Sequence, residues 1–520
     1  MPVPAIRLAA LLLTAILTLF AASCGRQHEE SREQARPAPS AVAPESHAAP
    51  DPQHSVVRIN STQQSWNPWQ PWEKNRPTKR RALAAVVAAE RVLTTAELVA
   101  DATYLELESI DGTRFARAKV EAIDYEANLA LLTAEDATEG AAILNGTQPV
   151  RIANPSPAGS MLQVLQIEEN GVPLLTDGVL QSVELAEGFL ANHSFLTYKL
   201  KASMRSVASS FSLPVLRDGA LAGLLVSYSQ DDQLSDVIST DILQRFLDDA
   251  ADGNYQGFPM LGVSVARTED ASFRKWLKLD GHDGGLYIQS VRHGGAADLA
   301  GTRKGDVLLA IDEMSIDRRG YYHHPLYGSI PWGHLIRGSR STQDEVELSL
   351  LRDGVPVTLR ATLIREEESD RLVPNHVFGT GPNYLVKGGM IFQELTLPLL
   401  QSFGDDWRSR APLELLDALQ YPEKYRDRMD RVVFLSGVIP TPATLGYEQL
   451  RNLVIHRVNG REIRHIGDLI EAIGTTETSI HSVEFANENL TVNLDEALAT
   501  TIDAELLRRG IPRLSRRDGN

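Results

Sequence analysis

Short segments in which apolar and polar residues alternate recur along the chain between Ser55 and Tyr228. Such alternation is typical of β-strands that bury one face. The following stretch DILQRFLDD, residues 241–249, spaces its apolar residues as one face of a helix. Beyond Gly253 the pattern changes to mixed strands and short helices, which predicts smaller α+β modules. The predicted strands are SVVRI, RALAAVV, YLELES, ARAKVEAI, LALLT, GVLQSVEL, LTYKLKA and ALAGLLVSY.

Residues 1–23 have the layout of a secretory signal peptide. Arg7 precedes an apolar run from Leu8 to Phe20, and small residues follow this run. A membrane-spanning helix needs about 20 apolar residues, so a permanent span is the weaker interpretation.

The only cysteine of the chain, Cys24, follows the small residues directly and resembles the lipidated cysteine of bacterial lipoproteins. Ala21 stands where such signals usually have Leu, and cleavage that leaves a free thiol is the alternative. The resemblance implies several acyl chains on Cys24, which together hold a protein on a bilayer. We expect a lipid-anchored membrane protein of the cell envelope that faces the periplasm, and Gly25 favours the outer membrane.

Composition limits the number of domains and the class of partner. Residues 24–54 are rich in Pro, Ala and charge, so we predict a disordered tether there. The whole chain of 520 residues is long enough for three or four domains. Because 51 Lys and Arg face 68 Asp and Glu, the net charge of -17 argues against nucleic acid as a partner.

Residues 55–250 resemble the trypsin-like double β-barrel of the Deg/HtrA protease family in three segments that occur in the family's order. TTAELV is similar to the catalytic-histidine motif, usually TNAHVV, and has Glu97 at the histidine position. NLALL is similar to the catalytic-aspartate motif, usually DLAVL, and has Asn128 there, with Asp124 four residues upstream. SSFSLPVL aligns with GNSGGPL and has Phe211 at the nucleophile position. The resemblance implies a protease fold whose triad is replaced.

These replacements predict a protein that is not an active enzyme. Serine hydrolysis needs a base, a carboxylate that orients the base, and backbone amides shaped by glycine. A phenyl ring offers no nucleophilic atom, and a carboxylate at Glu97 is a poor base. The alternative is that the alignment with GNSGGPL is shifted, so that Ser210 or Ser212 is the nucleophile. This shift restores neither the catalytic histidine nor the glycine turn that forms the oxyanion hole. We favour a former site filled by packing and hydrogen-bonding side chains.

The segment SWNPWQPWEKNRP carries Trp66, Trp69 and Trp72 among prolines. The resemblance implies self-association, because an aromatic N-terminal segment packs related proteases into trimers. A clasp onto the chain's own barrel is the equal alternative.

Residues 257–365 resemble the PDZ domain that follows the protease in this family, with GTRKGDVLLAID as the most specific motif. Gly294 and Gly295 replace the usual Pro-Gly turn. The resemblance implies that a peptide adds as a strand and that loop amides receive its carboxylate. A purely structural module is the alternative. The predicted peptide-binding residues are Met260, Leu261, Gly262, Val263, Ser264 and Val265.

Residues 372–514 resemble the C-terminal PDZ-like region of plant Do-like proteases, in pieces such as LVPNHVFGTGPNYLVKGGMIFQELTLPLLQSFGDDW and VNGREI. A helix is predicted from Ile466 to Ile473. In that family this module is mostly ascribed to assembly. Its carboxylate-loop position holds Gly389, Met390, Ile391 and Phe392.

The sequence therefore predicts a mainly β, multi-domain protein: a double β-barrel, a PDZ domain and a C-terminal PDZ-like domain. We expect it to bind peptide segments or partner proteins in envelope quality control, or to co-assemble with an active paralogue. No cofactor or metal is expected. The alternatives are a serine endopeptidase with an unusual set of catalytic residues and a chaperone that does not hydrolyse its clients.

Overall fold

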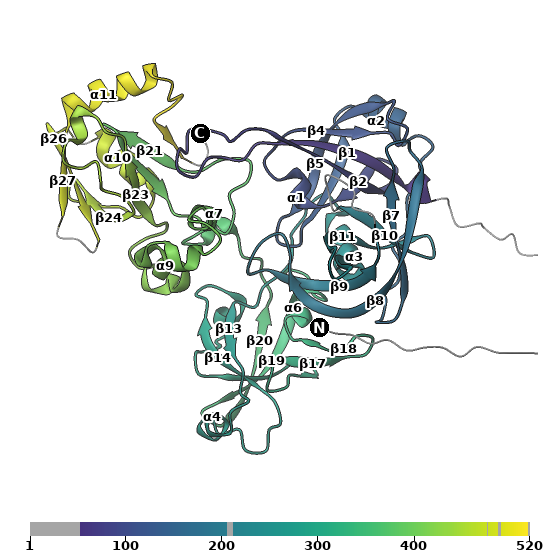
Figure 1. The fold of residues 1–520 in the computed structure, drawn as a ribbon. Helices are drawn as coiled ribbons and strands as arrows, with labels where there is room; N and C mark the ends of the chain where they lie inside the picture. The colour runs from purple at the N-terminus through teal and green to yellow at the C-terminus, as the bar shows by residue number, and fades with distance from the viewer. Residues whose placement is uncertain (1–51, 205–211, 476, 487–489, 518–520) are drawn as a thin grey trace, which may run out of the picture. The chain divides into compact units, whose positions relative to one another are not determined.

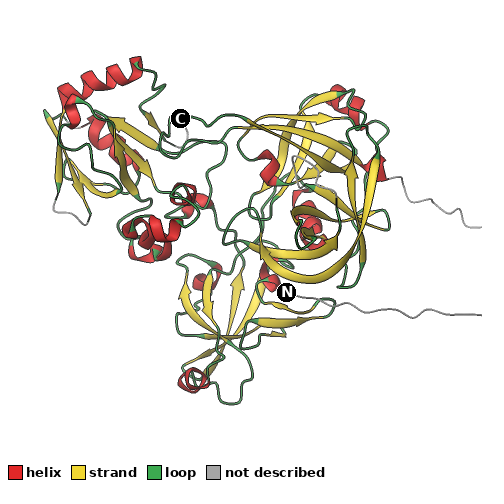
Figure 2. Cartoon of the chain, in the orientation of Figure 1, coloured by secondary structure: helices red, strands yellow, loops and turns green. Residues whose placement is uncertain are grey.

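The computed structural model describes residues 52–204, 212–475, 477–486 and 490–517. Figures 1 and 2 show its helices and strands, and residues 49–520 belong to one compact unit. The predicted signal peptide, Cys24, most of the predicted tether, Ser210 and Phe211 lie outside the described residues.

The first barrel contains six strands closed in the order β1-β2-β3-β6-β5-β4. Ile59, Leu107 and Leu132 are fully buried inside it. Because branched and small side chains fill the interior, the barrel is a packed core. Its elements are η1 (Pro52–Ser55), β1 (Val56–Gln63), β2 (Thr78–Ala88), β3 (Arg91–Thr94), α1 (Ala96–Val99), β4 (Ala102–Glu108), β5 (Phe115–Asp124), β6 (Leu129–Ala134) and α2 (Ala137–Leu144).

A second barrel follows, closed in the order β10-β11-β12-β9-β8-β7. The helix predicted at residues 241–249 is confirmed as α3, which buries Ile242, Leu243 and Phe246. Two closed six-stranded barrels in succession form the trypsin-like double β-barrel, so the predicted fold class is confirmed. The elements are β7 (Met161–Ile167), β8 (Pro173–Glu187), β9 (Ser194–Ala202), β10 (Leu213–Arg217), β11 (Ala220–Ser229), β12 (Leu234–Ser239) and α3 (Thr240–Ala250).

The next module has a sheet in the order β13-β14-β15-β19-β20, with β16 beside β15 and a separate β17-β18 hairpin. Strand β13 ends this order, so one of its edges pairs with no described strand. The elements are β13 (Val263–Ala266), α4 (Ala271–Trp276), β14 (Leu286–Val291), α5 (Ala296–Leu299), β15 (Val307–Ile311), β16 (Met314–Ser315), β17 (Tyr321–His324), β18 (Gly328–Pro331), α6 (His334–Arg337), β19 (Glu345–Arg352) and β20 (Val355–Thr362).

The C-terminal module has a sheet in the order β27-β26-β24-β23-β22-β21-β28, with β25 beside β24. The helix predicted from Ile466 is confirmed as α10, which buries Ile466, Leu469 and Ala472 on one face. The elements are η2 (Glu368–Asp370), β21 (Tyr384–Lys387), β22 (Met390–Glu394), α7 (Leu397–Gln401), α8 (Trp407–Arg410), α9 (Leu413–Gln420), η3 (Pro422–Lys424), β23 (Val433–Val438), η4 (Pro442–Thr444), β24 (Leu453–Val458), β25 (Arg461–Glu462), α10 (Ile466–Thr475), β26 (Ile480–Phe485), β27 (Thr491–Asp495), α11 (Glu496–Arg508) and β28 (Ser515–Arg516).

The tryptophan segment lies against the chain's own C-terminal module. Trp72 is only 8% exposed, and its ring meets the Tyr384 ring with centroids 6.2 Å apart. The Arg516 guanidinium lies 3.8 Å from the centroid of the Trp66 ring, a cation–π contact. The segment is therefore a clasp on the chain's own fold, but its partner is the C-terminal module instead of the barrel. The oligomeric state stays a prediction.

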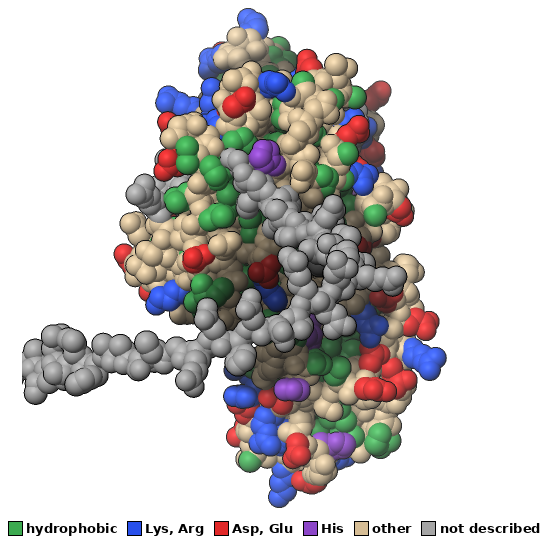
Figure 3. All heavy atoms as spheres, turned by 90° about the vertical axis from the view of Figure 1, so that its right-hand side faces the viewer, with side chains coloured by type: hydrophobic (Ala, Val, Ile, Leu, Met, Phe, Trp, Pro, Cys, Tyr) green, Lys and Arg blue, Asp and Glu red, His purple; other side chains and the backbone are tan. Residues whose placement is uncertain are grey.

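Charged side chains of both signs are interspersed on the face that Figure 3 shows. Within the part of the chain that the structure describes, no helix combines the length and the apolar character needed to cross a membrane.

Candidate functional sites

The positions of the histidine and aspartate motifs are in direct contact. Glu97 lies in the first turn of α1, and Asn128 directly precedes β6. The buried Asn128 side chain accepts, at Oδ1, a hydrogen bond of 2.8 Å from the Glu97 backbone N–H. Asn128 has a φ of 57°, a left-handed conformation in which Asn is enriched. The amide of Asn128 thus fixes the helix backbone, whereas a triad aspartate would orient a base.

The carboxylate of Glu97 is held in an ion pair. Its Oε1 lies 2.6 Å from Nη1 of Arg80, and both side chains are about two-fifths exposed. A cavity of about 160 Å³ beside Glu97 is also lined by Glu126, Glu187 and Asp236, and its described lining contains no histidine. A carboxylate that already binds a guanidinium is poorly placed to remove a proton from a hydroxyl group. This cavity therefore offers acceptors but no imidazole.

The alternative catalytic residues make structural contacts. Ser212 is 2% exposed, and its Oγ lies 3.2 Å from Oγ1 of Thr94. Asp124 is fully buried and accepts a hydrogen bond of 2.8 Å from the Tyr255 hydroxyl. Ser212 is thus poorly placed to act as a nucleophile.

A groove of about 520 Å³ lies beside β13. Residues 260–264 form one side, and Trp332, Ile336 and Arg337 line it from α6 and the preceding turn. Five of the six residues predicted to bind peptide therefore line one groove. Val265 is absent from this lining and packs against the hydrophobic core.

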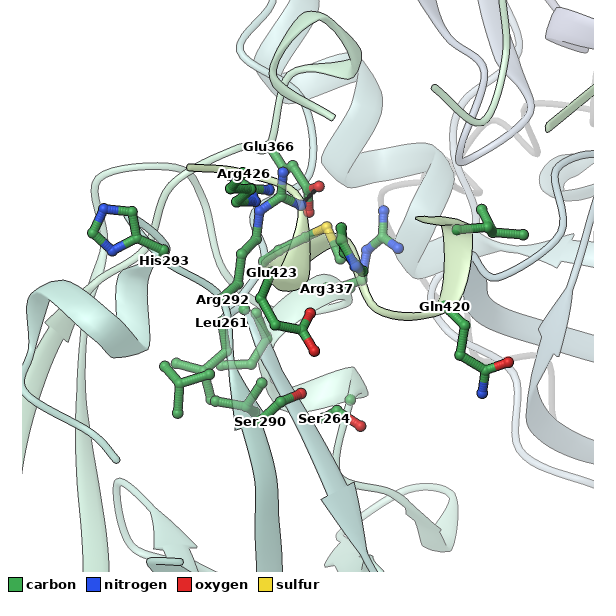
Figure 4. A pocket seen from close by; sticks show the side chains of 18 of the residues that line it. Leu261, Ser264, Ser290, Arg292, His293, Arg337, Glu366, Gln420, Glu423 and Arg426 are labelled. Atoms are coloured by element: carbon green, nitrogen blue, oxygen red, sulfur yellow. Dashed lines mark ion pairs between the residues drawn. The ribbon is translucent and has the colours of Figure 1, made fainter. Parts of the chain in front are cut away.

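Part of the C-terminal module also walls this groove. Residues 419–426, from the end of α9 through η3 to the turn that follows it, contribute several lining side chains. Figure 4 shows that Glu423 reaches from this segment into the pocket, while Arg292, Glu366 and Arg426 gather at one end. A ligand in the groove would therefore meet both modules.

The GGMIF loop of the C-terminal module is covered by the chain itself. The Gly389 carbonyl accepts a hydrogen bond of 2.7 Å from the Ile439 N–H. Met390, Ile391 and Phe392 are buried in β22, which pairs with β21 on one side and β23 on the other. Strand β21 thus occupies the edge where a peptide strand would add. Among the described residues, both edges of β22 are thus paired, whereas β13 has an open edge.

Sequence reasoning missed a buried polar cluster formed by separate parts of the chain. His193, between β8 and β9, is 1% exposed, and its Nδ1 lies 3.2 Å from Oε2 of Glu126. The Asn375 side-chain nitrogen lies 3.1 Å from His193 Nε2, and Arg337 pairs with Glu126. Burial opposes the charge of Glu126, but His193 and Arg337 outweigh it and lower its pKa to about 2. The cluster joins the barrels to both later modules.

The same cluster has three groups of the kind that bind metals. Glu126, His193 and Glu368 place ligand atoms within 4.8 Å of one another. The Arg337 guanidinium, however, already pairs with Glu126 and lies 3.2 Å from His193 Nδ1, where it supplies the positive charge. The cluster is therefore built around an arginine. Its only sequence signal is His193, the sole histidine between His54 and His282.

Comparison with known proteins places the chain in a family. Residues 258–320 and 373–513 each match a family described as PDZ domain. Protease Do-like 2, chloroplastic, from Arabidopsis thaliana is 25% identical over 469 residues, or 88% of this chain and 74% of the relative. Protease Do-like 4, mitochondrial, from the same plant is 24% identical over 445 residues, or 84% of this chain and 80% of the relative. The chain belongs to the Deg/HtrA family of Do-like proteases with PDZ domains.

Sequence identity to solved structures is lower than identity to these two plant relatives. HtrA-type protease AlgW with decapeptide has a TM-score of 0.44 and 18% identity, and the match covers 62% of this chain and 98% of that chain. The serine endoprotease from Yersinia pestis has a TM-score of 0.40 and 15% identity, with 62% of this chain and 96% of that chain covered. At the positions that the sequence aligns with the family's histidine and aspartate motifs, Glu97 pairs with Arg80 and Asn128 accepts a hydrogen bond from a backbone N–H.

Proposed function

We propose that this Do-like protein is catalytically silent and binds extended peptide ends through the groove of its first PDZ domain. The groove of about 520 Å³ beside the open edge of β13 carries this proposal. The structure records no hydrogen bond from the backbone N–H of Leu261 or Gly262 to any described residue. A strand added to β13 would place a terminal carboxylate near these amides.

A charged substitution in the groove tests the proposal. Val263→Asp is expected to weaken the binding of apolar C-terminal peptides, whose affinity we expect to be about micromolar, by at least about tenfold. A carboxylate at this position would be desolvated by a bound apolar side chain. Fluorescence anisotropy with labelled peptides measures the change.

The matched control is Val355→Asp on β20, because Val355 is 62% exposed and lies outside the groove lining. It should leave the affinity unchanged. A peptide array without any binder at high concentration, or equal affinities of the two variants, would favour a purely structural module.

Binding without hydrolysis is supported by the groups at the former triad. Glu97 binds Arg80, and Asn128 binds the helix backbone. Such a protein could hold exposed peptide ends in envelope quality control or regulate an active relative by co-assembly. A serine endopeptidase is the second candidate, and covalent labelling of a nucleophile separates the two.

We propose further that lipid on Cys24 anchors the protein to a membrane of the cell envelope, facing the periplasm. The apolar run from Leu8 to Phe20 and the small residues before Cys24 support this proposal. Cys24→Ser is expected to move the protein from the detergent phase to the aqueous phase on partitioning, because several acyl chains are lost. Ser23→Ala, which keeps a small residue beside Cys24, is the control and should stay in the detergent phase. A Cys24→Ser protein that remains bound to membranes would contradict lipidation.

A further inference from the structure

A second cavity, of about 420 Å³, adjoins the groove of the first PDZ domain. Its lining includes four arginines, Arg292, Arg371, Arg408 and Arg426, and one carboxylate, Glu366. Arg292, Arg426 and Glu366 also line the groove, so the two spaces are neighbours. Figure 4 shows these three side chains gathered at one end of the groove. We call this second space the arginine cavity.

Two of the four arginines are neutralised by carboxylates. Arg292 pairs with Glu366. Arg371 Nε lies 3.1 Å from Glu366 and 3.0 Å from Glu368. Two guanidinium groups thus face two carboxylates.

The other two arginines have no carboxylate partner in the described parts of the chain. Arg408 lies over the ring of its neighbour Trp407, 4.4 Å from the ring centroid. No ion pair of Arg426 is recorded with any described residue. Burial, followed by repulsion from Arg371 and Arg426, lowers the pKa of Arg292 to about 10. The arginine cavity therefore has two surplus positive charges in a chain whose net charge is -17.

We infer that the arginine cavity binds an acidic side chain of the peptide held in the groove, so that the preferred ligand has Asp or Glu near its C-terminus. This inference rests on the proposed function. The Arg292 backbone N–H donates a hydrogen bond of 2.8 Å to the Gly262 carbonyl, which places Arg292 beside the loop expected to receive the peptide's end. Guanidinium groups match a carboxylate with paired hydrogen bonds. The continuity of the two spaces favours an anion carried by the peptide over a free anion.

The test uses one neutral peptide with an apolar end and copies with Glu at each of the last three positions. Fluorescence anisotropy with the full chain is expected to show at least one acidic copy binding about tenfold more tightly than the neutral peptide. This difference should shrink as salt is raised, because added salt screens charge pairs that water reaches.

Arg408→Gln with Arg426→Gln is the decisive variant, because neither residue has an acidic partner that its loss would strand. It should bring the affinity for the acidic copies down to that for the neutral peptide. Arg408→Gln alone, at a residue that lines the arginine cavity but not the groove, should weaken the preference and leave the affinity for the neutral peptide unchanged. Arg428→Gln is the matched control, since Arg428 is exposed on the same segment and lies outside the cavity lining. The control should keep the preference. A circular dichroism spectrum that matches that of the unsubstituted protein shows that each variant is folded.

Equal binding of neutral and acidic peptides overturns the inference while the proposed function stands. A preference that survives in the double variant overturns it as well. If inorganic phosphate stabilises the protein against heat and acidic copies gain nothing over the neutral peptide, the cavity is a site for free anions, and the inference fails. No binding of any peptide overturns the proposed function itself.

Discussion

Purified protein is expected to leave casein intact and to remain unlabelled by a fluorophosphonate probe. Labelling needs a hydroxyl group activated by a neighbouring base, but Glu97 is paired with Arg80 and the Asn128 amide binds a backbone N–H. Loss of a whole triad costs about a millionfold in turnover, so hydrolysis should fall below detection. Gel-based labelling beside an active Do-like protease measures both outcomes.

Variants that restore the family's catalytic residues give a stricter test of this prediction. Phe211→Ser alone is expected to stay silent, because a serine without its base gains little over water. Adding Glu97→His and Asn128→Asp is expected to leave it silent too, since the oxyanion hole depends on backbone conformations that glycine permits. Activity in the triple variant would show that the barrel keeps its catalytic geometry. Cleavage that Ser210→Ala or Ser212→Ala abolishes would establish the endopeptidase alternative.

Glu126→Ala is expected to lower the free energy of unfolding by about 3–5 kcal/mol, because it leaves Arg337 and His193 buried without the carboxylate that pairs with both. Urea denaturation followed by circular dichroism at neutral pH measures the change. The matched control is Glu121→Ala in the same barrel, which breaks a surface pair with Arg91 and should cost about 0–1 kcal/mol. Equal midpoints for the two variants would mean that this charge does not hold the cluster together.

The pH dependence of stability gives an independent check on Glu126. Burial disfavours its charge, but His193 and Arg337 favour it more, so its pKa falls from the ordinary 4.5 to about 2 in the folded protein. A depressed pKa stabilises the fold above the unfolded value of about 4.5, and this contribution is lost as pH falls toward 2. Glu126→Gln should therefore show a shallower loss of stability over this interval than the unsubstituted protein. If the stability of the two proteins falls in parallel with pH, other groups cause the loss of stability in acid.

The alternation of apolar and polar residues predicted strands such as β5, where Ala116 and Ala118 point inward between exposed residues. It did not reveal β12, because Ser235 and Ser239 are buried there and give no apolar signal. Strand β7 was missed for a related reason: Gln166 is buried beside the buried Leu165, so the period of two is broken. Strands packed on both faces lose the pattern on which such predictions depend.

The contact between Glu97 and Asn128 could be anticipated because family motifs relate the two positions. The cluster around His193 could not be anticipated from the sequence. His193 and Asn375 are 182 residues apart, and Arg337 and Glu126 are 211 apart, with no motif linking them. Periodicity reports which face of an element is buried, and it is silent on which distant module covers that face.

The tryptophan clasp also sets an order of events during synthesis. Arg516 donates a hydrogen bond of 3.4 Å to the Pro71 carbonyl, across 445 residues of sequence. Closing so long a loop costs only slightly more entropy than closing one half its length, about 0.6 kcal/mol. The clasp still forms late, because the ribosome makes the tryptophans long before it makes β28. The tryptophan segment, which follows β1 directly, must therefore wait until β28 has been synthesised, and both barrels can close before the clasp does.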